Sequence, residues 1–169
     1  LWEIRARRVI HDQEAQQLYF ENAHLRVAGL PIFWLPRMRL PDPTLDRATG
    51  FLTPSIRSND QYGIGLKLPY FIVLGDRRDL TLTPYLSPNT TTLEARYRQA
   101  YMAGLIEVNG ALSNDTELDG TRGYLFATGA FALPGDWQLR FDLQAASDDS
   151  YLLDYDYSGT DRLTSELSL

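Results

Sequence analysis

Residues 137–145 read Trp-Gln-Leu-Arg-Phe-Asp-Leu-Gln-Ala. The apolar members fall on one side of an extended chain and the polar members on the other: Trp137, Leu139, Phe141, Leu143 and Ala145 against Gln138, Arg140, Asp142 and Gln144. Side chains of a strand point alternately to two faces. This alternation therefore predicts a β-strand with one apolar and one polar face.

The same period-two alternation recurs in residues 61–70, 79–86, 91–98 and 162–169. In the first of these segments the residues expected on one face are Tyr62, Ile64, Leu66, Leu68 and Tyr70. Turn-forming residues separate the segments at short intervals. Almost no part of the sequence keeps a helical repeat of apolar residues over three turns. The sequence predicts an all-β fold of antiparallel strands.

The composition excludes some classes of function. The chain has 16 Lys and Arg against 22 Asp and Glu, a formal charge of −6, and no basic run longer than two arginines, so we expect no nucleic-acid binding. It has no cysteine, and therefore neither a disulfide nor a thiolate metal site. No apolar stretch reaches the roughly 18 residues of a membrane helix, whereas barrel strands cross a bilayer in short alternating segments.

The strands expected in residues 1–40 are short, and a proline-rich break at 40–47 follows them. We expect 1–40 to be the end of one β-domain, 41–50 a linker, and 51–169 the beginning of a second domain. The chain opens at Leu1 and no signal peptide is visible, so we expect it to be a segment of a longer protein.

Six short motifs occur in one order between residues 29 and 155. They read Gly29-Leu-Pro-Ile-Phe-Trp-Leu-Pro36, Arg47-Ala-Thr-Gly-Phe-Leu-Thr-Pro54, Leu68-Pro-Tyr-Phe71, Asp79-Leu-Thr-Leu-Thr-Pro84, Glu94-Ala-Arg-Tyr-Arg98 and Ser147-Asp-Asp-Ser-Tyr-Leu-Leu-Asp-Tyr155. Each alone is weak, but together they make the chain resemble the LPS-assembly outer-membrane proteins, the LptD family.

This resemblance implies the end of a periplasmic β-jellyroll that receives lipopolysaccharide, followed by about eight strands of a large transmembrane barrel. It implies a place in the outer membrane, with the N-terminal part in the periplasm. We expect no cofactor. It also implies three partners: lipopolysaccharide, the periplasmic bridge protein LptA, and the plug lipoprotein LptE where one is present.

Pro54 and Pro69 are the sharpest local feature, because they flank the first expected hairpin turn of the barrel. A proline removes one ladder donor and belongs at edges or bulges of a sheet. Residue spacing alone leaves two interpretations open: the prolines merely start or end strands, or they mark a weak seam. The resemblance favours the seam, since in the family lipid leaves through a lateral gate there.

Several charged side chains alternate toward the face that would line a barrel's polar interior: Glu94, Arg96, Arg98, Arg140 and Asp142. An acidic run, Asp148, Asp149, Asp154, Asp156 and Asp161, has the oxygen ligands that Ca²⁺ prefers but not the spacing of a dedicated calcium loop. We therefore expect a solvated outer loop, whose Tyr151, Tyr155 and Tyr157 mark the membrane interface.

We expect no enzyme and assign no catalytic residue. The only histidines, His11 and His24, lie outside the expected barrel, and no nucleophile-elbow or zinc-protease motif occurs. Lipopolysaccharide transport is the favoured function. A porin or substrate-specific channel and a soluble β-sandwich module for carbohydrate are the alternatives, and the sandwich predicts that the apolar faces pack against each other.

Overall fold

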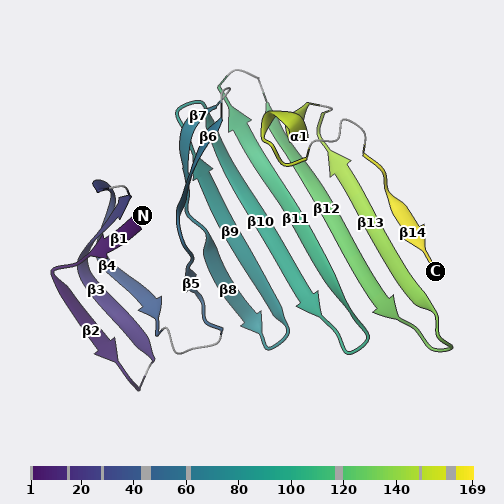
Figure 1. Ribbon diagram of the computed structural model, residues 1–169, viewed down its shortest axis with the longest axis horizontal. Helices are drawn as coiled ribbons and strands as arrows, with labels where there is room; N and C mark the ends of the chain where they lie inside the picture. Colours follow the sequence, from purple (N-terminus) through teal and green to yellow (C-terminus); the bar gives the residue numbers. More distant parts are fainter. Residues whose placement is uncertain are drawn as a thin grey trace.

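The computed structural model describes residues 2–14, 16–27, 29–42, 47–59, 62–116, 120–148, 150–158 and 163–169. Nearly all of the regular structure in these residues is antiparallel strand, with one short helix, so the predicted all-β fold is confirmed. The strands form a small sheet and a large sheet that lie side by side (Figure 1).

The small sheet consists of β1 (Trp2–Arg5), β2 (Arg8–Asp12), β3 (Gln17–Val27) and β4 (Leu30–Pro41). The long strand β3 is central: it pairs with β1 and β2 along one side and with β4 along the other. Pro31, Pro36 and Pro41 are all on β4. β4 tolerates them because it is an edge strand of this sheet, where some backbone donors have no ladder partner.

The large sheet contains β5 (Gly50–Phe51), β6 (Ser55–Asn59), β7 (Gly63–Lys67), β8 (Tyr70–Gly75), β9 (Arg78–Leu86), β10 (Thr90–Ala100), β11 (Gly104–Asp115), β12 (Thr121–Ala132), β13 (Gln138–Ala146) and β14 (Glu166–Ser168). From β8 onward, strands that follow each other in the sequence are neighbours in the sheet. Before that, β6 pairs with β7, β5 pairs with β8, and both β7 and β8 pair with β9. Among the described residues β6 and β14 lie at opposite ends and do not pair. The sheet is therefore an open wall.

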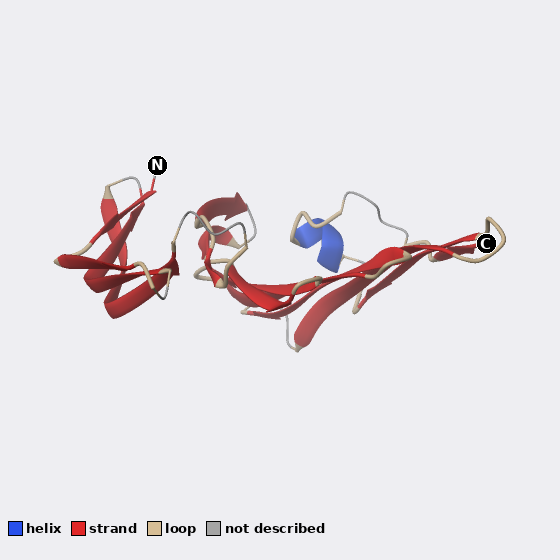
Figure 2. Ribbon diagram, turned by 90° about the horizontal axis from the view of Figure 1, so that it is seen from below, coloured by secondary structure: helices blue, strands red, loops and turns tan. Residues whose placement is uncertain are grey.

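The two faces of this wall differ in polarity, as the alternation predicted. Leucines with 49–71% exposure line one face: Leu93, Leu112, Leu125, Leu143 and Leu167. Polar side chains line the other face, and those of Thr92, Ser113 and Arg122 are buried beneath the one-turn helix α1 (Tyr151–Asp154) and the residues after it. Figure 2 shows that the sheet is curved and that α1 lies on its concave side.

The structure corrects one predicted face. Ile64 and Leu66 lie on the apolar face, since Leu66 is the register partner of Leu86. Tyr62 does not share that face; it is buried among polar groups of the concave side. The reason is Gly63, whose φ of 75° breaks the alternation between the turn and β7.

Candidate functional site

The first two predicted strands of the large sheet are both interrupted at the prolines. Pro54 lies between β5 and β6, and Pro69 lies between β7 and β8. Here residues 52–54 lie opposite only residues 68–69, because Phe51 pairs with Tyr70 and Ser55 with Lys67. The extra residue makes a β-bulge. One backbone hydrogen bond spans the interruption, from Leu52 N to Pro69 O at 2.9 Å.

A third proline, which the sequence analysis did not assign to the seam, lies in the next strand. Leu68 N donates to Pro84 O at 3.1 Å, but Pro84 has no N–H with which to donate back. Residues 54, 69 and 84 follow each other at intervals of 15. This spacing was the sequence signal that could have identified Pro84. When the chain turns and runs back as an antiparallel strand, a residue about 15 positions later lies beside the first one.

An apolar cavity of about 60 Å³ lies between the small sheet and this interrupted strand pair. Side chains of both sheets line it: Ile4, Ala23, Leu25, Phe33, Leu35, Met38, Leu40, Phe51, Leu52, Pro54 and Leu68. The sequence did not predict the cavity, since period-two patterns do not say which sheet edges meet. Pro54 is thus both a break in the first strand and part of an apolar wall.

The five charged residues predicted for one face do share the concave face. The register aligns Arg98 with Glu107, Thr128 and Asp142 across four strands. It also aligns Arg96 with Asn109 and Phe126. They do not form one cluster. Lys67 forms an ion pair with Glu94, and Arg98 donates to Asp79 at 3.0 Å. Arg140 is exposed and donates to Gln138, while Asp142 accepts a hydrogen bond from the Gln144 amide.

Arg47 is a residue of the predicted linker that proves to be fixed. Its guanidinium donates to Asp79 Oδ2 at 2.7 Å and to the carbonyl oxygen of Asp76 at 2.6 Å. Asp79 is buried and receives Arg98 as well. Two arginines therefore neutralise one buried carboxylate and attach the chain before β5 to the turn between β8 and β9.

Residues 150–158 are not the solvated outer loop that we predicted. Tyr151 and Tyr155 are buried, and Tyr157 is largely covered. Their hydroxyls bond to the concave face: Tyr151 to Ser113 at 2.5 Å, Tyr155 to Thr90 at 2.6 Å, and Tyr157 to Glu94 at 2.6 Å. The assignment of these tyrosines to a membrane interface is wrong, because each hydroxyl finds its partner on the polar side of the sheet.

The acidic residues of this segment serve Arg122. Two Arg122 nitrogens bind the Asp148 carboxylate at 2.9 and 2.6 Å, Nη2 also reaches Asp154 at 2.8 Å, and Nη1 reaches Asp115 at 3.2 Å. Within the described residues no three acidic, histidine or cysteine side chains come together to hold a metal ion. Asp149 and Asp161 lie outside the described residues, and Asp156 takes a positive φ of 53°.

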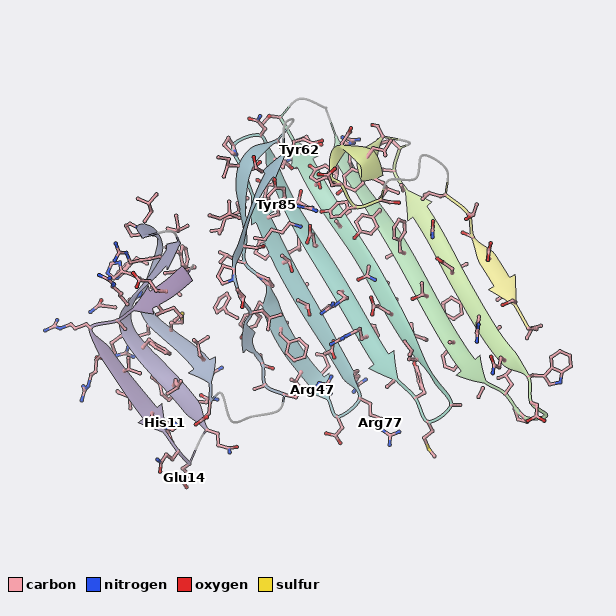
Figure 3. All side chains as sticks on the ribbon, viewed as in Figure 1. His11, Glu14, Arg47, Tyr62, Arg77 and Tyr85 are labelled. Carbon is pink, nitrogen blue, oxygen red and sulfur yellow. The ribbon has the colours of Figure 1, made fainter. Side chains whose placement is uncertain are left out.

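The same segment contacts the first hairpin. Tyr155 stacks on Tyr62, and Arg57 of β6 donates to the Tyr155 carbonyl oxygen at 3.2 Å. Tyr62 and Tyr85 lie at the same end of the sheet as α1 (Figure 3). Residues 150–158 therefore connect the middle of the wall, at β11 and β12, with the strand that carries Pro54.

The histidines lie in the small sheet. His11 Nε2 forms a hydrogen bond with Asp42, and this bond joins β2 to the end of β4. His24 is exposed and lies opposite Trp34. Neither histidine is among the residues that line the apolar cavity. In the described part of the chain, no helix is long and apolar enough to cross a membrane.

Fold and site together define an all-β protein with an amphipathic sheet whose first strands are interrupted beside an apolar cavity. The chain is 31% identical over 173 residues to the LPS-assembly protein LptD of Pseudoalteromonas translucida, and 30% identical over 156 residues to that of Nitrosococcus oceani. These alignments cover 99% and 91% of the chain. The predicted resemblance to the LPS-assembly protein family is confirmed.

A further relative, the LPS-assembly protein LptD of Xanthomonas euvesicatoria, is 29% identical and covers 92% of the chain. The chain spans only about a fifth of the length of these curated relatives, from 19% to 23%. No family model matches the chain.

Proposed function

We propose that this chain is part of an outer-membrane translocon component that inserts lipopolysaccharide into the outer leaflet through a lateral opening at the first strands of a barrel. One observation carries the proposal: the interrupted strand pair at Pro54 and Pro69 lies between an apolar cavity and a polar concave face. An amphiphile needs both environments at once.

The division of the lipid between them follows from solvation. Each CH₂ of an acyl chain gains about 0.8 kcal/mol when it leaves water. Sugar hydroxyls, in contrast, lose hydrogen bonds in an apolar medium. The acyl chains would therefore pass the apolar side of the interrupted strands, while the sugars follow the concave face. The cavity of about 60 Å³ would have to widen for an acyl chain to pass, and parting of the interrupted strands would widen it.

The proposal places the large sheet in the outer membrane, with its apolar face toward lipid, and the small sheet in the periplasm. In this arrangement residues 1–40 end the periplasmic domain, 41–50 link it to the barrel, and 51–169 begin the barrel. The small sheet would receive lipopolysaccharide from the bridge protein LptA, and the concave face would look toward the plug lipoprotein LptE. No catalytic step is needed.

The alternatives fit the structure less well. A soluble β-sandwich would bury its apolar faces against each other, whereas Leu112 and Leu125 are 63% and 56% exposed on a single-layered wall. A porin would share the amphipathic wall. It would give no reason for an apolar cavity between a second sheet and strands interrupted by proline.

The proposal is tested by filling the cavity. Ala23 is 2% exposed and lines it, so Ala23→Leu in the full-length protein should occupy the space that acyl chains need. We expect lower surface lipopolysaccharide at matched levels of the protein in the membrane. Ala130→Leu, the same change at an exposed position of β12, is the control. Normal export by Ala23→Leu would contradict a lipid route through this cavity.

A further inference from the structure

A second pocket of about 310 Å³, with both polar and apolar walls, opens on the concave face, at the lower end of the roughly 300–1,000 Å³ that ligand pockets occupy. It lies over β9, β10 and β11, and residues from the interrupted strands form one wall. Its lining consists of Leu52, Pro69, Thr81, Thr83, Glu94, Ala95, Arg96, Asn109, Gly110 and Tyr124.

Two polar groups in this pocket lack partners among the described residues. Arg96 Nε is buried without a hydrogen bond, and so is Oγ1 of Thr81, a residue that is only 6% exposed. The two residues are register partners on β10 and β9, so they face the pocket from adjacent positions. Buried polar groups in folded proteins are nearly always hydrogen-bonded. An unused guanidinium donor beside an unused hydroxyl is therefore suited to a ligand that accepts from both.

The charges around the pocket specify the sign of that ligand. Glu94 also lines it, but this carboxylate is paired with Lys67 and accepts a hydrogen bond from the Tyr157 hydroxyl. Asn109 uses its amide nitrogen to donate to Glu107 at 2.9 Å. Arg96 forms no ion pair with any described residue, and an arginine stays charged in a protein. The pocket thus carries one uncompensated positive charge, which favours an oxyanion.

The remaining walls favour a sugar as the carrier of that oxyanion. Tyr124 contributes an aromatic ring, and Leu52 and Pro69 contribute apolar surface. A pyranose ring has apolar C–H faces that pack on an aromatic ring such as that of Tyr124. Its hydroxyls can form hydrogen bonds with a side-chain hydroxyl such as that of Thr83. Leu52 lines the apolar cavity as well, so one side chain separates the two compartments.

We infer that the pocket around Arg96 and Thr81 binds the phosphoryl or carboxylate group of an anionic saccharide. Arg96 supplies a charge-assisted hydrogen bond, Thr81 donates its hydroxyl proton, and Tyr124 packs on the ring. This inference rests on the proposed function: the acyl part of an amphiphile reaches the apolar cavity on one side of Leu52 while its anionic head reaches Arg96 on the other.

The test is a titration of the purified full-length protein in detergent with three probes: glucosamine 1-phosphate, inorganic phosphate and glucosamine. We expect the sugar phosphate to bind most tightly. Arg96→Gln should weaken its binding at least tenfold, since hydrogen bonds to charged groups contribute that much. Thr81→Val should weaken it severalfold, and Arg96→Lys should retain more affinity than Arg96→Gln. Arg140→Gln, the same change at an exposed arginine of the same face, should bind normally.

Equal weakening by Arg96→Gln and Arg140→Gln would overturn the site, as would wild-type binding by Arg96→Gln. Inorganic phosphate binding as tightly as glucosamine 1-phosphate would overturn the saccharide assignment. The titration involves no export, so its failure differs from failure of the proposed function. That function fails when Ala23→Leu exports lipopolysaccharide normally, whatever Arg96 binds.

Discussion

Tyr62, in the turn of the first hairpin, and Tyr155, just after α1, stack with ring centroids 4.3 Å apart and an interplanar angle of 27°. The Tyr62 hydroxyl lies 3.3 Å from Arg122 Nη1, and Tyr155 bonds to the buried Asp115. The pair therefore couples the hairpin that contains β6 to a charged cluster on β11 and β12.

Removing one ring should release this coupling. Tyr155→Ala deletes a buried aromatic side chain, a change that typically costs about 3–5 kcal/mol. We expect faster proteolytic cleavage between β13 and β14 in the full-length protein. Tyr101→Ala, at a turn residue that is 44% exposed, should leave the cleavage rate unchanged. Equal rates for the two variants would show that residues 150–158 are not held by the stack.

Arg122 should be the most sensitive charged residue of the wall. Arg122→Gln leaves the fully buried Asp115 side chain without its cation, and breaking a buried ion pair costs about 3–5 kcal/mol. Arg140→Gln should cost less than about 1 kcal/mol, because Arg140 is exposed. The free energy of unfolding in denaturant measures both. A similar loss for the two variants would contradict the central role of Arg122.

Acid should release the segment that contains α1. Hydrogen bonds from Arg122 lower the pKa of Asp148 below its usual value of 3.8. The ionised carboxylate therefore stabilises the folded state fully above about pH 4, and this contribution is lost as the pH falls through the lowered pKa. The near-UV circular dichroism of the tyrosines should change in that range. Asp148→Asn should remove part of the pH dependence of this signal. An acid transition unaltered by Asp148→Asn would show that protonation of Asp148 does not release the segment.

The prolines should set how easily the first strands part. In Pro54→Ala with Pro69→Ala, each restored donor that finds a ladder partner adds about 0.5–1.5 kcal/mol. Two such bonds shift an opening equilibrium by about tenfold or more. We expect less surface lipopolysaccharide and greater sensitivity to large antibiotics at unchanged protein level. Pro88→Ala, in the exposed turn after β9, is the control. Normal export by the double variant would contradict a gate at these strands.

Adjacent residues of β13 should respond oppositely to the same substitution. Leu143 is 49% exposed on the apolar face, whereas Gln144 is on the concave face. Leu143→Arg should impair membrane assembly by about 2–4 kcal/mol if the residue is near the bilayer midplane, and Gln144→Arg should be mild. Heat-modifiable migration of the full-length protein reports assembly. Equal tolerance of both changes would argue against a bilayer on the apolar face.

The sequence predicted the features that follow from local alternation. The strands, the two faces of the wall and the shared face of Glu94, Arg96 and Arg98 depend only on a period of two. Residues 150–158 escaped prediction because their acidic composition is that of a hydrated loop. Their burial depends on one distant arginine, Arg122, and on hydroxyl partners spread over β10 and β11.

The apolar cavity and the pocket around Arg96 could not be predicted from the sequence either. Each is lined by residues from separate strand groups that meet at Leu52, and no periodic pattern records such a meeting. In the sequence, the role of Pro84 is indicated only by the interval of 15 residues that separates it from Pro69. This interval can be interpreted only when the register of β8 and β9 is known.

The three prolines have a mechanical consequence. Residues 54, 69 and 84 lie at one level on three successive passes of the chain, so the missing donors form a line that crosses the strands. A sheet bends most readily along such a crease. The tip formed by β6 and β7 would swing as a flap once its ladder bonds to β9 and its contacts with Tyr155 are released, while β5 and β8 below it would keep their ladder bonds. Opening would be a rotation of one short hairpin, and the rest of the wall would keep its shape.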